Sequence, residues 1–265
     1  MALRWTILAC ALLAGVLAAA PGWAADLTAD QVRAALASAS ADRPADLSGK
    51  NLSELDLSEL DFKHANLAHA DLFGTKLVGA NLSGANLSGA RLDLAWIIRA
   101  DFSGANLTEA SLFGPVVALT MAPPAPGDAP RFTGADLSGA RVIARLSGVD
   151  LRNARFVGAR LGVDLKNQPM GQMRNDFSGA DLTGADLSNA DVNRANLAFA
   201  KLNNANLSGA VLFRADLSQA DLTGADIAGA DFTEADLDGT VLTGVKGADA
   251  AKGLDKAVHA DKAQR

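Results

Sequence analysis

The chain has 265 residues, and its 24 lysines and arginines against 30 aspartates and glutamates give it a formal net charge of -6. This acidic balance argues against a nucleic-acid-binding protein by bulk charge. Aromatic residues make up only 5% of the chain and tyrosine is absent, so an ordinary compact globule with large core side chains is not expected.

Residues 1–24 have the pattern of a cleavable secretory signal peptide. Arg4 is the only charge before Asp26, and a long apolar run follows it until Pro21 interrupts the run. Small residues at Gly22 and Ala24 then form a cleavage-like site, which predicts cleavage after Ala24. The alternative, a membrane anchor, is disfavoured because the run is shorter than the roughly 20 apolar residues that a span needs.

Cys10 is the only cysteine and lies inside this leader. Removing the leader therefore leaves a chain with no disulfide and no metal site of the cysteine type. We expect a periplasmic or secreted protein that has no transmembrane span after cleavage.

Residues 25–44 predict a short capping helix. Thr28 and Gln31 are spaced as a capping box, and apolar residues follow at Val32 and Leu36. The helix is expected to stop before Pro44 and to cover the first part of the structure that follows.

From residue 45 to residue 245 a large apolar residue recurs every five positions. Fourteen such residues run from Leu47 to Leu112, seven from Phe132 to Leu161, and fourteen from Phe177 to Leu242, which makes 35. We call this position i. Alanine is usual at i-2, aspartate or asparagine at i-1, serine or threonine at i+1, and glycine at i+2. Neither a helix nor a long strand gives one large apolar residue in five.

The unit has a simple physical interpretation. Positions i-2 and i lie two apart in a short extended segment, so both side chains point to one side while i-1 points to the other. Glycine at i+2 allows a sharp corner. The chain is therefore predicted to coil around a narrow interior, filled by the residue at i.

The stretches SGANLSGARL (83–92) and SGADLTGADL (178–187) closely resemble the pentapeptide-repeat family. The resemblance implies an all-β fold, a right-handed quadrilateral parallel β-helix with one unit on each face. At ~4.8 Å per coil, nearly nine coils would make a rod on the order of 40 Å long. Stability would come from stacking of neighbouring coils, with short helical caps at both ends.

Two segments break the repeat and are predicted to be loops. Residues 114–131 hold five of the eight prolines, and proline cannot donate to a ladder. This first loop is expected to occupy one whole coil, because Leu112 and Phe132 are 20 apart. The second loop covers residues 162–176, and Val142 to Leu146 is a unit of only four residues. Loops on a rigid solenoid are the usual place for specificity.

The segment 246–265 is predicted to be a C-terminal cap and tail. Leu254 and Val258 stand at helical spacing in an otherwise charged sequence, which favours a weak helix over the last coil.

The acids at i-1 raise the possibility of DNA mimicry, since some members of the family are acidic rods that inhibit gyrase, a topoisomerase. Residues one coil apart should stack, yet in the two regular runs only Asp216 and Asp236 put two acids together. Asparagine or lysine falls between most of the others, which removes like-charge repulsion. The pattern therefore favours a solvated scaffold with amide ladders.

A basic region lies between residues 131 and 175, with eight bases and three acids. Stacking in the shifted register would pair Arg131 with Asp150, Asp136 with Arg155 and Arg145 with Asp164. Arg141 would then lie over Arg160, a like-charged pair, and three further bases would be unmatched. The predicted partner-binding residues are Arg141, Arg152, Arg160, Lys166 and Arg174.

The three methionines after the leader, Met121, Met170 and Met173, all lie in the two loops. Thioethers suit Cu(I), so a metal site in the loops is one interpretation. The other, which we favour, is that they anchor the loops to the solenoid wall. His64 and His69 are expected to be exposed corner residues, because a zinc site needs three or four converging ligands.

Enzyme signatures are missing from the sequence: it has no phosphate loop, nucleophile elbow or histidine near a plausible serine. The sequence therefore predicts a non-enzymatic exported scaffold with no cofactor, which binds a protein or an envelope component through its middle. Two alternatives stay open, a DNA-mimic inhibitor of gyrase and a periplasmic metal-binding protein that uses the loop methionines.

Overall fold

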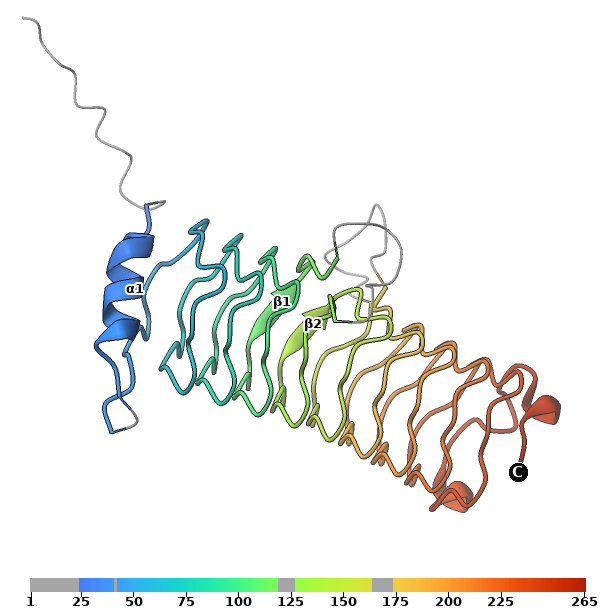
Figure 1. Ribbon diagram of the computed structural model, residues 1–265. Helices are drawn as coiled ribbons and strands as arrows, with labels where there is room; N and C mark the ends of the chain where they lie inside the picture. Colours follow the sequence, from blue (N-terminus) through green and yellow to red (C-terminus); the bar gives the residue numbers. More distant parts are fainter. Residues whose placement is uncertain (1–23, 41, 119–126, 164–173) are drawn as a thin grey trace, which may run out of the picture.

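Stacked coils, each joined to the next by short parallel bridges, form a solenoid along the molecule (Figure 1). The computed structural model describes residues 24–40, 42–118, 127–163 and 174–265. The bridges join residues at i-1, and a regular coil contributes one to each of four columns. Columns A, B, C and D begin with the bridges Asp46–Asn66, Asn51–Asp71, Asp56–Lys76 and Asp61–Asn81.

The period of five residues therefore sets the path of the chain. Column A runs through nine successive bridges from Asp46 to Lys246. At ~4.8 Å for each bridge the solenoid is about 43 Å long. The prediction of a β-solenoid built from five-residue units is confirmed.

A continuous apolar core runs through the interior. All 35 residues at position i are buried, and the most exposed of them, Leu242, shows only 5% of its surface. Alanine at i-2 leaves room for them. Thr75 and Thr240 replace alanine at this position without leaving an unsatisfied group, because their hydroxyls donate to the carbonyl oxygens of Leu52 and Leu217 at 2.8 Å.

The corners of the coils use the left-handed backbone region at i+2. Glycine is frequent there, as at Gly49 with φ 64°, but Glu54 and Phe199 adopt the same region with φ 60°. His64 and His69 are exposed corner residues with φ 59° and 57°, as predicted. The fold thus accepts L-residues at the corners despite the cost of this conformation.

The carboxylates and amides at i-1 form hydrogen bonds with the backbone of their own turn and with side chains of the neighbouring coils. Asp46 Oδ1 accepts the backbone N–H of Ser48 at 3.1 Å and the side-chain amide of Asn66 at 2.9 Å. Asn86 and Asn106 extend the same ladder, with bonds of 3.1 and 3.2 Å. These groups shape the turn and link the coils, which confirms the prediction of amide ladders.

Helix α1, Ala29–Ala37, lies across the N-terminal end of the solenoid (Figure 1). The Thr28 hydroxyl accepts the Gln31 N–H at 3.2 Å, and the Gln31 side chain accepts the Thr28 N–H at 2.7 Å. The predicted capping box is confirmed. Val32 is fully buried and Leu36 packs partly buried on the core, so the apolar face of α1 contacts the core.

The first insertion adds ten residues to one coil. Asp101 and Arg131 are bridged although they are thirty residues apart. The chain stays in the coil as far as Val117, since Val116 bridges Trp96 and Val117 is buried. The expectation that this loop replaces one whole coil is therefore wrong: three of the four faces of that coil are regular.

Strands β1, Ser111–Phe113, and β2, Arg141–Ile143, pair in parallel beside this insertion (Figure 1). The core continues past it because the rings of Phe102 and Phe132 stack with centroids 4.8 Å apart.

The second insertion is closed by a buried asparagine. Asn175 is 1% exposed, and its amide donates to the carbonyl oxygens of Val142 at 2.6 Å and Leu161 at 2.5 Å. Its Oδ1 accepts the N–H of Ala144 at 2.6 Å. The next residue, Asp176, then bridges Arg145. The expected stacking of Arg145 on Asp164 is therefore wrong, because the chain re-enters the column only after the insertion.

The C-terminal coil is built from six-residue units rather than from a helix. Its bridges step by six, at Lys246, Lys252, Val258 and Gln264. The 3-10 helices η1, Ala248–Ala250, and η2, Ala260–Lys262, contain some of the additional residues.

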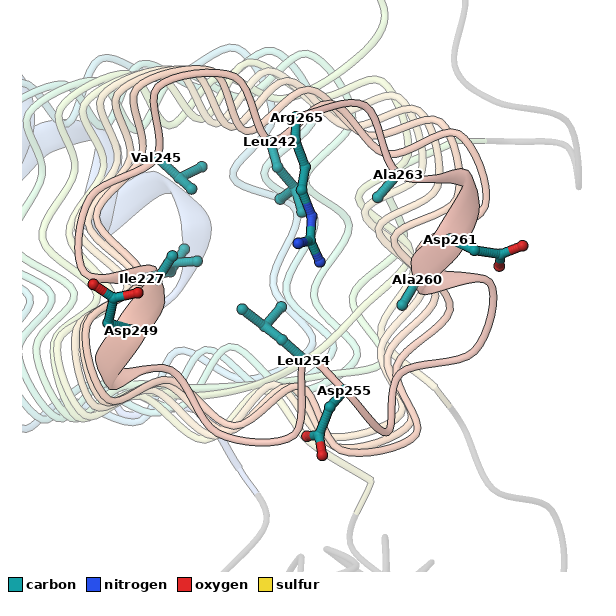
Figure 2. A pocket seen from close by; sticks show the side chains of 11 residues that line it. Ile227, Leu242, Val245, Asp249, Leu254, Asp255, Ala260, Asp261, Ala263 and Arg265 are labelled. Atoms are coloured by element: carbon teal, nitrogen blue, oxygen red, sulfur yellow. The ribbon is translucent and has the colours of Figure 1, made fainter.

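The predicted helix over Leu254 and Val258 is wrong. Gly247 and Gly253 take left-handed φ values of 70° and 69°, which interrupt a helix. The N–H groups of Lys252 and Val258 instead donate to the preceding coil at 2.7 and 2.8 Å. A cavity of about 720 Å³ lies at this wider coil. Figure 2 shows that Leu242, Leu254 and Arg265 are among the residues that line it.

Candidate binding groove

Column B differs from the other columns in its outward side chains. Position i+1 holds a phenylalanine at Phe73, Phe113 and Phe213 and no other aromatic residue anywhere in the repeat. All three belong to units of column B, because Asp71, Ser111 and Val211 precede them in it. Serine or threonine usually occupies this position and helps to form the turn. Aromatic side chains in its place indicate that this face makes contacts instead.

An arginine accompanies each of these rings, and Arg214 Cζ lies 4.9 Å from the centroid of the Phe213 ring. Arg91 Cζ lies 4.3 Å from the centroid of the Phe73 ring, and Arg141 Cζ lies 5.2 Å from that of Phe113. In the Phe73 and Phe113 pairs the arginine comes from the coil after the phenylalanine. The ring holds the guanidinium in place by a cation–π contact.

A groove of about 860 Å³ lies along column B, from Arg141 near the middle of the solenoid to Asp231 near its C-terminal end. Arg141 and Arg160 line it together with the apolar residues Ile143, Val163, Val211 and Phe213 and the acids Asp191 and Asp231. It opens beside the second insertion, where the regular corner is missing. Gly162 has no side chain there, and a Cβ would meet the Asn193 amide nitrogen at 2.0 Å. The groove thus owes its shape to the interruption of the repeat.

The two arginines of the groove are neighbours. Arg141 and Arg160 form a parallel bridge, which places their backbones about 4.8 Å apart. Arg160 is exposed and forms no ion pair within the described residues. Asp191 follows it in the column, but Asp191 Oδ1 accepts both the backbone N–H and the side-chain amide of Asn193, at 3.1 and 2.6 Å. Two arginines on adjacent coils that line one groove favour binding of an anion.

The other predicted binding residues do not join this pair. Arg152 belongs to column D and chelates Asp150, with Nη2–Oδ2 at 2.7 Å and Nε–Oδ1 at 2.9 Å. The prediction that Arg152 is unmatched is therefore wrong. This contact lowers the pKa of Asp150 to about 2. Arg174 is exposed and does not line the groove, and Lys166 lies outside the described residues.

The acidic columns contain a further stacked pair besides Asp216–Asp236. The second insertion brings Asp150 and Asp181 into register. Asp150 lies outside the two regular runs, within which Asp216–Asp236 is the one stacked pair, as expected. Arg152 beside Asp150 offsets the added charge. Across the part of the chain that the structure describes, no column places three acids in succession.

No group of three or more histidines, cysteines or acids that could hold a metal occurs among the described residues. Met121, Met170 and Met173 lie outside them, so the copper interpretation stays a prediction. In the described ranges no helix is both long and apolar enough to cross a membrane.

Four residues of this face were not predicted from the sequence: Phe73, Phe113, Phe213 and Val211. The signal was available in principle at i+1 for the phenylalanines and at i-1 for Val211, where aspartate or asparagine is usual. The sequence alone does not show that these four residues share one face. The spacing across each insertion does not reveal on which face the next run begins.

A comparison against family models agrees with the repeated units that form the four columns of bridges. A model described as pentapeptide repeats, in eight copies, matches residues 45–77, 75–112, 176–212, 193–227 and 205–244. Together these segments cover just over half of the chain. The chain belongs to the pentapeptide repeat family. The one region inside the solenoid of this pentapeptide repeat protein that the family model leaves unmatched, residues 113–175, includes both insertions and the groove arginines.

Solved structures of other pentapeptide repeat proteins are similar to it. HetL, involved in heterocyst differentiation regulation in the cyanobacterium Nostoc sp. strain PCC 7120, is 30% identical, with 90% of this chain and 94% of HetL covered and a TM-score of 0.37. A protein of the Arabidopsis thaliana thylakoid lumen is 30% identical over 55% of this chain and 66% of its own, with a TM-score of 0.25.

QnrB1, a plasmid-mediated fluoroquinolone resistance protein, is 18% identical over 77% of this chain and 79% of its own, with a TM-score of 0.33. No curated protein matches.

Proposed function

We propose that this pentapeptide repeat protein is an exported, non-enzymatic scaffold that binds a protein or an envelope component through the groove on column B. The observation that carries the proposal is the adjacency of Arg141 and Arg160 in one groove with an apolar wall. A rigid solenoid holds these groups at fixed spacing, so little conformational entropy is lost when a partner binds.

The proposal includes the finer geometry of the scaffold. We infer a right-handed, four-sided coil whose first turn is covered by α1 and whose last turn is widened by the six-residue units. The four bridge columns and the burial of Val32 support this geometry. Wide coils and helices at the ends would protect the edges of the solenoid from unwanted pairing.

Export is the second part of the proposal and rests on the leader of residues 1–24. Fractionation of cells and N-terminal sequencing test it directly. We expect the mature protein outside the cytoplasm with Ala25 as its first residue. A full-length protein in the cytosol would remove export from the proposal and would favour the alternative of gyrase inhibition.

Affinity capture from a solubilised envelope fraction tests the binding surface. Wild-type protein is compared with the double variant Arg141→Glu/Arg160→Glu, and we expect the variant to lose the captured partner. The control is Lys76→Glu/Lys201→Glu, which makes the same change of charge on columns C and D at two exposed lysines whose salt bridges are long, 3.7 and 3.9 Å. Equal loss in both variants would mean that net charge rather than the groove is responsible.

A further inference from the structure

We infer that the groove takes an extended peptide segment with an acidic side chain at one end and a large apolar side chain near its middle. This inference rests on the proposed function and names the chemistry of the partner. It follows from the order of side chains along column B, which runs from Arg141 and Arg160 through Asp191 and Val211 to Asp231.

The basic end of the groove fits one carboxylate. Arg141 and Arg160 come from adjacent coils and both line the groove, so their long side chains can donate to one carboxylate bound in it. The ring of Phe113 at 5.2 Å fixes the position of the Arg141 guanidinium.

The middle of the groove fits an apolar side chain. Val211 is 39% exposed at i-1, where most units of the repeat carry aspartate or asparagine. An asparagine there would accept the backbone N–H at i+1 and donate to the coil before it, as Asn206 does with Ser208 and Asp186 at 3.0 and 3.1 Å. Valine makes neither bond. A local rule broken without a structural gain indicates a contact with another molecule.

The acids of the groove, Asp191 next to Arg160 and Asp231 at the far end, select against polyanions. Asp191 and Asp231 line the groove, and they would repel the phosphates of a nucleic acid or the repeated acids of an anionic polysaccharide. Backbone N–H groups or a basic side chain of a peptide would instead be favoured. Four bridge steps from Arg141 to Asp231 span about 19 Å, the length of roughly six residues in an extended strand.

Selection from a phage-displayed library of random dodecapeptides on the purified protein tests the inference. We expect enrichment of peptides in which an aspartate or glutamate stands within four residues of a large apolar residue. The enriched peptides, made synthetically, are then titrated against the wild type and two variants by fluorescence anisotropy.

Val211→Asn is the decisive variant. It should weaken the peptides at least about tenfold, because the apolar contact of one side chain is lost. It should not lower the melting temperature, because asparagine restores the two local hydrogen bonds. Loss of binding can then not be attributed to unfolding. Arg141→Glu/Arg160→Glu should abolish binding, and Lys76→Glu/Lys201→Glu should leave it within about twofold of the wild type.

Two kinds of outcome would overturn the inference. One is enrichment of peptides without acids, or binding that Val211→Asn leaves unchanged. The other is retention on heparin–agarose that depends on Arg141 and Arg160, which would assign the groove to a polyanion. Either result leaves the proposed function standing if envelope capture still depends on the arginines, whereas capture that ignores them refutes the proposed function itself.

Discussion

Gly247 lies directly against Ala228 of the preceding coil: a Cβ on residue 247 would stand 2.5 Å from the Ala228 Cβ and 2.6 Å from its Cα. Two of the atoms in the way belong to the backbone, so no side-chain rotation can relieve the contact. The six-residue coil can therefore approach the five-residue coils only through a glycine at this point.

Gly247→Ala is expected to detach the C-terminal coil. Gly244→Ala is the matched control, because Gly244 also has a left-handed φ of 64° but has nothing within 4 Å of its Cβ position. The control should cost about 1–2 kcal/mol from backbone strain alone. Gly247→Ala should cost clearly more and should speed hydrogen exchange at Lys252 and Val258. Equal costs in urea unfolding would contradict the close contact.

Replacing Phe199 by glycine should stabilise the protein. Phe199 stands at a corner with φ 60° and is 65% exposed, so it has left-handed strain and little packing. Removing the strain is expected to raise the free energy of unfolding by about 1 kcal/mol. Gly179, at the same corner one coil earlier, has φ 63° and open space around it, so Gly179→Ala should have the opposite effect. A loss of stability in Phe199→Gly would mean that the ring packs on something else.

Asn175→Ala should be among the most damaging substitutions in the chain. It leaves the carbonyl oxygens of Val142 and Leu161 and the N–H of Ala144 without their partner in a buried place. We expect a loss of about 2–4 kcal/mol in chemical denaturation. Asn206→Ala, which removes a half-buried ladder amide, should cost only about 1 kcal/mol. Similar losses in the two variants would show that the insertion does not depend on Asn175.

Acid should lower the free energy of unfolding, in part because Asp150 becomes protonated. Its pKa falls from 3.8 to about 2 because Arg152 donates to its carboxylate. The folded pKa lies below the unfolded one, so this contribution is present above about pH 4 and is lost as the pH falls towards 2. The Thr223 and Thr233 hydroxyls lower the pKa values of Asp221 and Asp231 in the same direction.

Asp150→Asn checks this prediction, because asparagine can still accept the backbone N–H of Arg152 but carries no charge. Urea midpoints are measured from pH 6 to pH 2 for both proteins. The variant should be less stable than the wild type at pH 6, and the difference should shrink towards pH 2. A constant difference over this range would exclude the ion pair as its cause.

Much of the fold could be predicted from the sequence because the repeat is local. The burial of Leu47 and of Leu52 depends only on the unit that contains each leucine and on the coils beside it. The burial of Leu242 depends on its neighbours in the same way. The capping box of Thr28 and Gln31 is equally local, as its two hydrogen bonds span three residues.

The sequence by itself determined the five-residue period, the buried position i, the corner at i+2 and the structural use of the acids at i-1. Only the tertiary structure decided which faces meet after each insertion. The bridges from Asp101 to Arg131 and from Arg145 to Asp176 form where the chain can complete its backbone hydrogen bonds after each insertion. Their positions do not follow from the five-residue period. The Arg141–Arg160 pair could be predicted from the sequence, because no insertion separates the two residues. The groove around the pair, the place of Val211 in it and the six-residue coil could be found only in the structure.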